Sequence, residues 1–243
     1  MWDQRVNEVG PGLQARRIFV TSLTGSLNLA TQACNAGMYP VISFKTGSYS
    51  WAQVAAGNAD ADLRSMASRL AALPCDVFVA VAHEPDGNGT PADWSSMQVH
   101  ALPLLGPDPG VKVGVIGNGW WWSGTQRGLS DAEIAQWIPA SVINVSDVIA
   151  GDTYQGNATG EEPATKIANM GAWARRVGGV KALGVGEFNA QTAQGITNAT
   201  VALGSDPLFA WGCLWNADGA GGANASVLTG DRLAAFQAAL AAW

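Results

Sequence analysis

The stretch VFVAVAHEPDG at residues 77–87 decides the fold class of this 243-residue chain. Its six apolar residues are followed at once by a histidine, a glutamate and a turn-forming Pro-Asp-Gly. An apolar run without alternation is typical of a strand buried on both faces, as in a parallel sheet covered by helices. A second stretch, ALGVGEFN at residues 182–189, has the same design and carries Glu187. The two stretches predict parallel strands that each end in a single glutamate.

Similar apolar runs alternate with longer Ala- and Leu-rich segments along the whole chain. This alternation predicts a parallel sheet with helices outside it. The expected strands are residues 17–22, 39–45, 76–82, 111–117, 146–152, 182–187 and 209–215. The expected helices are residues 27–36, 61–72, 92–104, 130–143, 163–177, 192–203 and 231–242, the fourth starting with a capping box from Ser130 to Glu133.

Seven strands are one fewer than a (β/α)8 barrel contains, and the missing one would come first. Residues 1–12 read as a polar helix or loop, so either the chain starts after the natural first strand or the barrel is open at that point. An open doubly wound sheet is the alternative, but it usually carries a glycine-rich phosphate turn after its first strand, and none is evident here. We predict one α/β domain over residues 1–243, a (β/α)8 TIM barrel with an absent or atypical first strand.

Composition argues against two classes of partner. The formal net charge is −6 and no basic run occurs, so the phosphate-neutralising surface of a nucleic-acid-binding protein is missing. No apolar run reaches the roughly 18 residues that span a bilayer, and the first residues lack the pattern of a signal peptide. We expect no nucleic acid partner, no membrane insertion and no export address, while the localisation stays open.

Cysteine and tryptophan are the informative minor residues. The three cysteines follow no metal or disulfide spacing, so we expect them to act as small apolar residues. Eleven tryptophans stand against three tyrosines, and an indole ring can either stack on a sugar or fill a core. Their placement must decide between these roles.

Polar side chains gather where the expected strands end. In a barrel the reactive groups lie at the carboxyl ends of the strands, where the loops that follow them meet. A single polar residue at a strand end is explained by the solvated loop that follows it. Polar residues at six strand ends together indicate a functional site. The residues concerned are Lys45, His83, Glu84, Asn118, Asp152, Tyr154, Glu187, Asn189 and Trp215.

A run of three tryptophans lies just past the fourth expected strand, in GNGWWWSG at residues 117–124. Flanking glycines indicate a loop, and adjacent residues of an extended chain cannot all face one way. We expect at least one of Trp120, Trp121 and Trp122 to be exposed beside the cleft and to stack on a sugar. Packing under a long loop is the alternative.

The order of these motifs resembles the clan A glycoside hydrolases, specifically the family 26 mannanase-like group. The matching features are His83-Glu84, Asp152-x-Tyr154, Gly186-Glu187-Phe188 and Trp215, counted as strands four, six, seven and eight of a complete barrel. The resemblance covers nearly the whole chain from about residue 16. It implies that Glu84 is the acid/base, that Glu187 is the nucleophile, that His83 precedes the acid/base and that Tyr154 hydrogen-bonds the nucleophile.

This chain departs from the mannanase pattern directly after Glu84. The family has Asn-Gly-x-Trp there, whereas PDGNG stands at residues 85–89 of this chain. The loops that grip the sugar therefore differ while the two carboxylates remain. We predict a glycoside hydrolase that acts with retention, because paired carboxyl groups about 5 Å apart exclude an intervening water.

The expected substrate is a neutral or weakly charged polysaccharide, cut within the chain, such as a bacterial wall or capsular glycan. The resemblance also implies a setting in a larger phage tail or surface protein. The residues expected to bind sugar are Lys45, Asn118, Trp120, Trp121, Trp122, Asp152, Asn189 and Trp215. An ion pair between Lys45 and Asp152 is the alternative for these two. A non-catalytic glycan-binding barrel is the main alternative, and a lyase or transglycosylase using the same cleft is a third possibility.

No cofactor or metal is expected. The chain lacks a Gly-x-Ser-x-Gly elbow, a P-loop and a His-Glu-x-x-His helix. His100 is the only other histidine and falls in an expected helix, where we expect a structural role. A carboxylate-bound calcium at Asp86 or at Glu161 and Glu162 has no further support, because acidic loops are usually just solvated.

Overall fold

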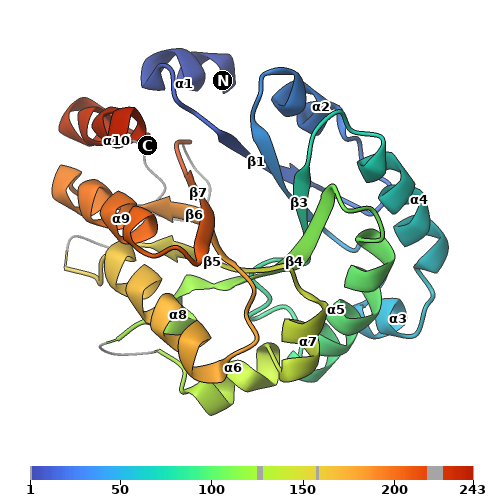
Figure 1. Cartoon of the computed structure of the whole chain (residues 1–243). Helices are drawn as coiled ribbons and strands as arrows, with labels where there is room; N and C mark the ends of the chain where they lie inside the picture. Colours follow the sequence, from blue (N-terminus) through green and yellow to red (C-terminus); the bar gives the residue numbers. More distant parts are fainter. Residues whose placement is uncertain (1, 125–127, 157–158, 218–226, 243) are drawn as a thin grey trace.

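The computed structural model describes residues 2–124, 128–156, 159–217 and 227–242 (Figure 1). Seven parallel strands form one sheet in sequence order from β1 to β7. The strands are β1 Ala15–Val20, β2 Tyr39–Phe44, β3 Val77–Val81, β4 Val111–Asn118, β5 Val148–Tyr154, β6 Leu183–Asn189 and β7 Phe209–Leu214. They fall where the apolar runs predict them, and the TIM-barrel-like fold class is confirmed.

Helices surround the sheet on its outer side (Figure 1). They are α1 Trp2–Val9, α2 Asn28–Asn35, α3 Trp51–Ala55, α4 Asp60–Ala71, α5 Pro91–Leu105, η1 Gly119–Trp122, α6 Asp131–Trp137, α7 Ala140–Val145, α8 Pro163–Val177, α9 Ala193–Ser205 and α10 Gly230–Ala242. The sequence did not predict α3 or the single turn η1. No helix in the described ranges has the length and apolarity needed to cross a membrane.

The barrel is open between β1 and β7. Within the described residues β1 pairs only with β2, and β7 pairs only with β6. Helices α1 and α10 contact each other on the outer side of this seam, where the Gln237 amide donates a hydrogen bond to the Glu8 carbonyl at 3.0 Å (Figure 1). The gap therefore falls where the sequence predicts a missing strand, and helix α1 lies there.

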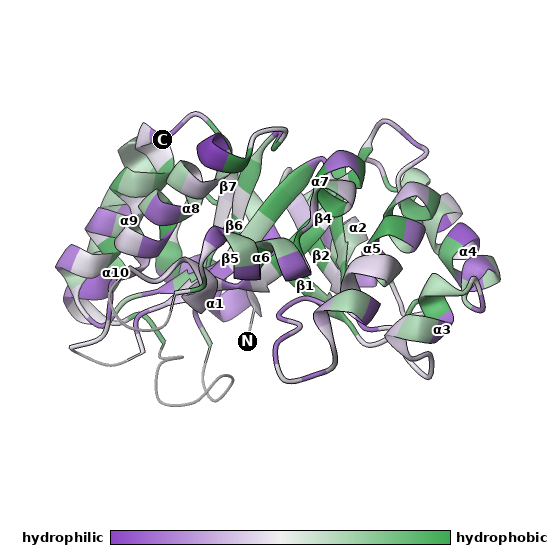
Figure 2. Cartoon of the chain, turned by 90° about the horizontal axis from the view of Figure 1, so that it is seen from below, coloured by the Kyte–Doolittle hydropathy of each residue, from purple (hydrophilic) through white to green (hydrophobic). Residues whose placement is uncertain are grey.

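Two apolar clusters hold the sheet from its two faces. The inner one fills the barrel and includes Phe78, Ile116 and Trp211. The larger outer one lies between the strands and the helices, and Figure 2 shows its hydrophobic ribbon at the centre of the molecule with hydrophilic residues toward the helix surfaces. Burial on both faces explains why the strands read as continuous apolar runs.

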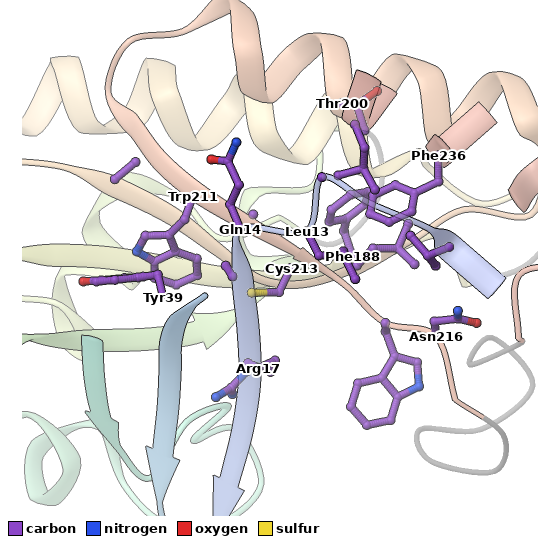
Figure 3. A pocket seen from close by; sticks show the side chains of 18 of the residues that line it. Leu13, Gln14, Arg17, Tyr39, Phe188, Thr200, Trp211, Cys213, Asn216 and Phe236 are labelled. Carbon is purple, nitrogen blue, oxygen red and sulfur yellow. The ribbon is translucent and has the colours of Figure 1, made fainter. Parts of the chain in front are cut away.

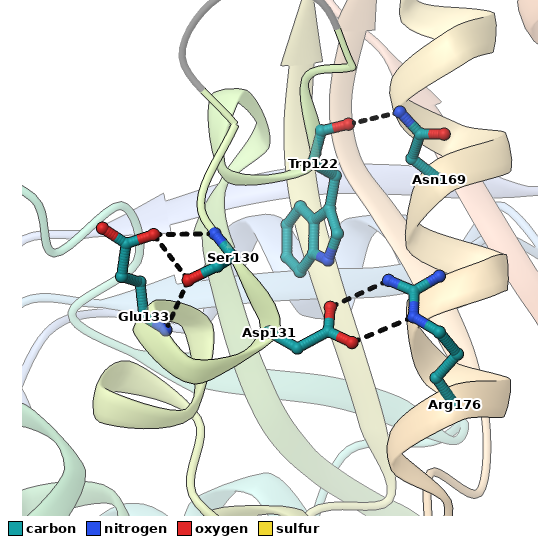
Figure 4. Close-up of polar contacts among 6 residues, drawn as sticks. All are labelled: Trp122, Ser130, Asp131, Glu133, Asn169 and Arg176. Atoms are coloured by element: carbon teal, nitrogen blue, oxygen red, sulfur yellow. Dashed lines mark hydrogen bonds and ion pairs between the residues drawn. The ribbon is translucent and has the colours of Figure 1, made fainter.

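The helix expected over residues 130–143 is two helices. Ser130 and Glu133 form the predicted capping box at the start of α6, and Asp131 pairs with Arg176 of α8 through two bonds of 2.8 and 2.9 Å (Figure 4). Pro139 follows α6 and cannot donate a helical hydrogen bond, so the chain starts again as α7. The expectation of one continuous helix was wrong.

The expectation for two of the three cysteines was also wrong. Cys34 and Cys75 form a disulfide with their Cα atoms 5.5 Å apart, which joins the end of α2 to the segment before β3. A disulfide requires proximity in space, and a separation of 41 residues carries no such information. Cys213 is free and buried in the inner core, as expected of a small apolar residue.

Candidate active site

Glu84 lies in a strained turn directly after β3. Both Ala82 and Glu84 have left-handed backbones, with φ of 50° and 48°, which non-glycine residues rarely adopt. In a regular strand successive side chains point to opposite faces, so His83 and Glu84 would diverge. The left-handed residues interrupt this alternation at the point where the two side chains enter the site.

Hydrogen bonds from three sides hold this turn. The Ala82 and Glu84 amides donate to carbonyls of β2 and β4 at 2.8 and 2.9 Å. From α5, the Trp94 indole donates to the Ala82 carbonyl at 2.8 Å, and the buried Gln98 amide donates to the Val81 carbonyl at 2.7 Å. These bonds fix the backbone from which Glu84 projects.

Glu187 reaches the interior through an irregularity in β6. Leu183, Val185 and Phe188 belong to the outer core, so the inward and outward alternation shifts by one residue between Val185 and Phe188. The strand pairing shifts at the same place against both β5 and β7. Such a bulge re-aims a side chain, and here it turns Glu187 toward the barrel interior.

Each oxygen of Glu187 has its own partner. The Tyr154 hydroxyl donates a hydrogen bond to Oε2, the contact that the family resemblance implies for these residues. Arg17 of β1 lies with its Nε 3.6 Å from Oε1. Burial raises the pKa of Glu187, while Arg17 and the Tyr154 hydroxyl act in the opposite direction by favouring its anion.

Glu84 has a different environment. Burial, followed by the negative charge of Glu187, raises the pKa of Glu84 to about 7. Burial and the nearby charges of Arg17 and Lys45 lower the pKa of His83 to about 3, so its imidazole is neutral at any ordinary pH. The two glutamates therefore have different electrostatic environments. Such a difference lets one carboxyl group of a pair act as the proton donor while the other acts as the anion.

Asp152 is a third carboxyl group, and it lies beneath the other two. It is 3% exposed, and in the part of the chain that the structure describes no side chain donates a hydrogen bond to either of its oxygens. Burial raises the pKa of Asp152 well above its usual range, and the charge of Glu187 adds to this. A Cβ on Gly186 would lie 2.3 Å from Asp152 Oδ1, so glycine is required there for the carboxyl group to fit. The group that approaches Gly186 most closely is therefore the Asp152 side chain.

Other predicted sugar-binding residues have structural roles. Asn189 is 1% exposed, donates to the Trp215 carbonyl at 2.8 Å and accepts from Arg232 at 3.1 Å. Burial likewise removes Asp152 from direct contact with a sugar in the cleft. The expectation that these two side chains touch sugar was wrong, because both lie below the surface that a sugar could reach.

Asn118 and Lys45 lie at the rim. Asn118 Oδ1 accepts a hydrogen bond from the Asp86 amide at 3.1 Å and so ties the end of β4 to the loop after Glu84. Lys45 is exposed directly after β2, and among the described residues it forms no ion pair with Asp152. Their contact with sugar stays a prediction.

The three consecutive tryptophans divide unequally. Trp121 and Trp122 are 0% and 3% exposed and pack with other indoles, including Trp94, Trp137 and Trp173. The expectation that these two stack on sugar was wrong, because the turn η1 folds them into the outer core. Trp120 is half-buried, and Trp215 is half-buried after β7.

Two residues of β1 belong to the site and were missed. Arg16 packs outward on Trp2, whereas Arg17 faces inward and reaches Glu187. Phe19, also inward, is 42% exposed and lies 5.5 Å from the His83 ring and 5.8 Å from the Trp215 ring. Two adjacent arginines in one strand are a signal for Arg17, since neighbouring side chains face opposite sides and one of them must face the interior.

A cavity of about 810 Å³ follows the open seam between β1 and β7. Its lining includes Leu13, Trp211 and Phe236, so it is mostly apolar (Figure 3). Arg17, Phe19 and Trp215 also line it, whereas the two glutamates do not. The cavity therefore adjoins the candidate active site without enclosing it.

Comparison of structures finds known proteins that are similar to this chain, whereas comparison of sequences finds none. No protein-family model matches the chain, and no curated protein matches its sequence. A fungal β-1,4-galactanase superposes with a TM-score of 0.66 at 15% identity, covering 96% of this chain and 89% of the galactanase. The family 26 domain of an endo-β-mannanase/endo-β-glucanase from Prevotella bryantii gives 0.61 at 9% identity, covering 98% and 83%.

A ruminal family 26 endo-β-1,4-mannanase gives a TM-score of 0.57 at 12% identity and covers 89% of this chain. This chain spans only 55% of that enzyme. Identities this low show a shared fold and nothing finer. The chain thus has the barrel architecture of known glycoside hydrolases, and its own residues must carry the functional argument.

Proposed function

We propose that this protein is a retaining glycoside hydrolase that cuts within a polysaccharide, with Glu84 as acid/base and Glu187 as nucleophile. The observation that carries the proposal is the contrast between the two glutamates. Tyr154 and Arg17 each hold one oxygen of Glu187 and favour its anion, while burial keeps Glu84 protonated up to a pKa of about 7. The fold that this chain shares with galactanases and mannanases supports the same function.

In the proposed mechanism Glu84 donates its proton to the leaving glycosidic oxygen as a Glu187 oxygen attacks the anomeric carbon. This step forms a covalent glycosyl-enzyme, and Glu84 then accepts a proton from the water that hydrolyses it. Retention requires the two carboxyl groups to lie about 5–5.5 Å apart across the sugar. Neutral His83 can donate or accept a hydrogen bond beside Glu84, either to position it or to hold a substrate hydroxyl.

The proposed substrate is a neutral or weakly charged polysaccharide. Phe19 and Trp215 offer apolar faces beside His83, and such faces suit the C–H surface of a pyranose ring. Half-buried Trp120, after β4, is a further candidate. The sequence resemblance favours a bacterial wall or capsular glycan as the substrate. It also favours a setting in which this chain is part of a larger phage tail or surface protein. The mannan and galactan substrates of the structural relatives define the first glycans to try.

The test is release of reducing ends from mannans, galactans, arabinans, glucans and purified bacterial wall polysaccharides. The parent should act on at least one of them, and Glu84→Gln and Glu187→Gln should each lose about 10²–10⁴-fold or more in rate. Glu8→Gln, on α1 outside the site, is the matched control and should keep full activity. Binding of a glycan without hydrolysis by the parent would instead favour the non-catalytic barrel. Products with an unsaturated or newly transferred sugar would reveal a lyase or transglycosylase.

A further inference from the structure

Three side chains beside the cleft converge in a way that the proposed hydrolysis does not require. One ligand atom each of His83, Glu84 and Asp152 lies within 4.8 Å of the other two. We propose that these three residues form a binding site for one divalent transition-metal ion of the zinc type. The proposed ion is a competitor of the sugar and not a cofactor of the reaction.

The backbone explains why the three groups meet. Glu84 and His83 are neighbours in sequence, and the left-handed conformations at Ala82 and Glu84 remove the alternation that would separate them. Asp152 comes from β5, two strands away from β3 in the sheet. Gly186 leaves the space that its carboxyl group occupies. Fixed elements therefore supply the ligands from two directions.

Charge balance favours a cation at this place. Three carboxyl groups, those of Glu84, Asp152 and Glu187, lie together here, against two cationic side chains, Arg17, which is paired with Glu187, and Lys45. Asp152 is 3% exposed, and among the described residues neither of its oxygens accepts a well-formed hydrogen bond, although the Glu187 backbone amide favours its anion. A buried carboxyl group of this kind must either hold a proton or face a cation. A bound metal ion would displace the proton and satisfy the vacant oxygens.

The ligand types select the metal. One imidazole nitrogen and two carboxylate oxygens suit Zn²⁺ and its first-row neighbours, whereas Mg²⁺ and Ca²⁺ favour sites made of oxygen alone. Zinc–ligand bonds of about 2.0–2.2 Å bring ligand atoms to roughly 3.3 Å from one another, so a side-chain movement of about 1–1.5 Å closes the group around an ion. Three protein ligands leave further positions open for water.

Metal bound here would engage Glu84 and prevent it from donating a proton. Zn²⁺ should therefore inhibit hydrolysis reversibly, and this consequence rests on the proposed function. The binding itself does not, because it can be measured without any substrate. The two ideas can consequently fail separately.

The test is a titration of the full chain with Co²⁺, whose visible absorption reports coordination, followed by displacement with Zn²⁺. We expect about one equivalent to bind. His83→Asn and Asp152→Asn should each weaken the affinity about tenfold or more, since each removes one of three ligands. Glu187→Gln should abolish turnover and keep the site. Circular dichroism and thermal melting establish that each variant is folded.

His100→Asn is the matched control. His100 is the other histidine of the chain and bonds to Asp60 at 2.6 Å on the outer helices, so its loss should leave both Co²⁺ affinity and activity unchanged. Co²⁺ that does not bind the parent, or that binds folded His83→Asn and Asp152→Asn as tightly as the parent, would overturn the metal site. A parent that binds Co²⁺ but cleaves no glycan would support the metal site and count only against the proposed hydrolysis.

Discussion

At the scale of single residues, the site depends on how one arginine and one tyrosine divide the oxygens of Glu187. Burial alone would hold this glutamate protonated and make it a poor nucleophile. The Tyr154 hydroxyl and the Arg17 guanidinium oppose that effect from two directions. Within the described residues no such pair bonds to the carboxylate of Glu84, and burial and the charge of Glu187 raise its pKa to about 7. The chemical difference between the glutamates thus originates in residues of β1 and β5.

Replacing Arg17 by methionine tests this assignment. The variant keeps an apolar side chain of similar length but removes the charge 3.6 Å from Glu187. Because that charge lowers the pKa of Glu187, the acidic limb of the profile of kcat/KM against pH should move to higher pH. Arg16→Met, on the outward face of the same strand, should not move it. An unchanged acidic limb in Arg17→Met would remove Arg17 from the site.

The pKa of Glu84 predicts the alkaline limb. Since Glu84 must carry its proton to act as an acid, kcat/KM should fall as the pH rises through about 7. The limb should be absent from the residual activity of Glu84→Gln. A parent whose activity is flat from pH 6 to about 9 would contradict the role of Glu84.

The same group makes stability depend on pH. The folded pKa of Glu84 lies above its ordinary value of 4.5, so the folded state holds the proton more tightly than the unfolded state. Its contribution to stability is therefore complete below about pH 4.5 and is lost as the pH rises through about 7. Urea unfolding at both ends of this window should show a smaller loss in Glu84→Gln than in the parent. An equal loss in both proteins would contradict the shift.

At the scale of secondary-structure elements, the strands could be predicted and their irregularities could not. Burial on both faces leaves an apolar run that the sequence displays openly. The shift in β6 and the left-handed turn after β3 each depend on contacts with other strands, which no local pattern encodes. The break at Pro139 was readable, because proline lacks the amide that a continuous helix needs. The role of Arg17 could also have been predicted, because two adjacent arginines occur in one strand and one of them must face inward.

The turn η1 separates the roles of adjacent tryptophans. Trp121 is fully buried among indoles, so Trp121→Ala should reduce the free energy of unfolding by about 3–5 kcal/mol. Trp120→Ala should cost clearly less because Trp120 is half-buried. Urea denaturation of the two variants measures the difference. Equal losses would contradict the placement of this turn.

The disulfide between Cys34 and Cys75 is a second test at this scale. It closes a loop with a sequence separation of 41, and the loss of chain entropy predicts a stabilisation of up to about 4 kcal/mol. The double variant Cys34→Ser/Cys75→Ser should lose about 2–4 kcal/mol in urea unfolding and keep its activity. Thiol titration of the oxidised, unfolded parent should find one free cysteine, Cys213. Three reactive thiols would show that the bond does not form.

At the scale of the whole molecule, parallel topology explains why the site could be located from sequence. Every strand carries its carboxyl end to the same edge, so glutamates about a hundred residues apart must lie near each other once the strands are recognised. The depth of each side chain below the surface of the site could not be predicted in the same way. Asp152, Asn189, Trp121 and Trp122 all lie close to that edge but below its surface, and only packing distinguishes them from residues that a ligand reaches.

The open seam is the other property of the whole molecule. The count of seven apolar runs left an open barrel as one of two possibilities, and helices α1 and α10 lie where they shield the two free strand edges from outside. Arg17 and Phe19 come from one edge strand and Trp215 follows the other, so the seam borders the candidate active site. The geometry of the site therefore depends on how well the barrel holds its shape without a closing strand.

The most direct test of the account is the anomeric configuration of the first product. A polysaccharide found in the reducing-end assay is digested with excess enzyme, and proton NMR follows the new reducing end before mutarotation. A nucleophilic Glu187 beside an acid/base Glu84 predicts a product with the configuration of the substrate. An inverted product, or retention that persists at the parent rate in Glu187→Gln, would contradict the account.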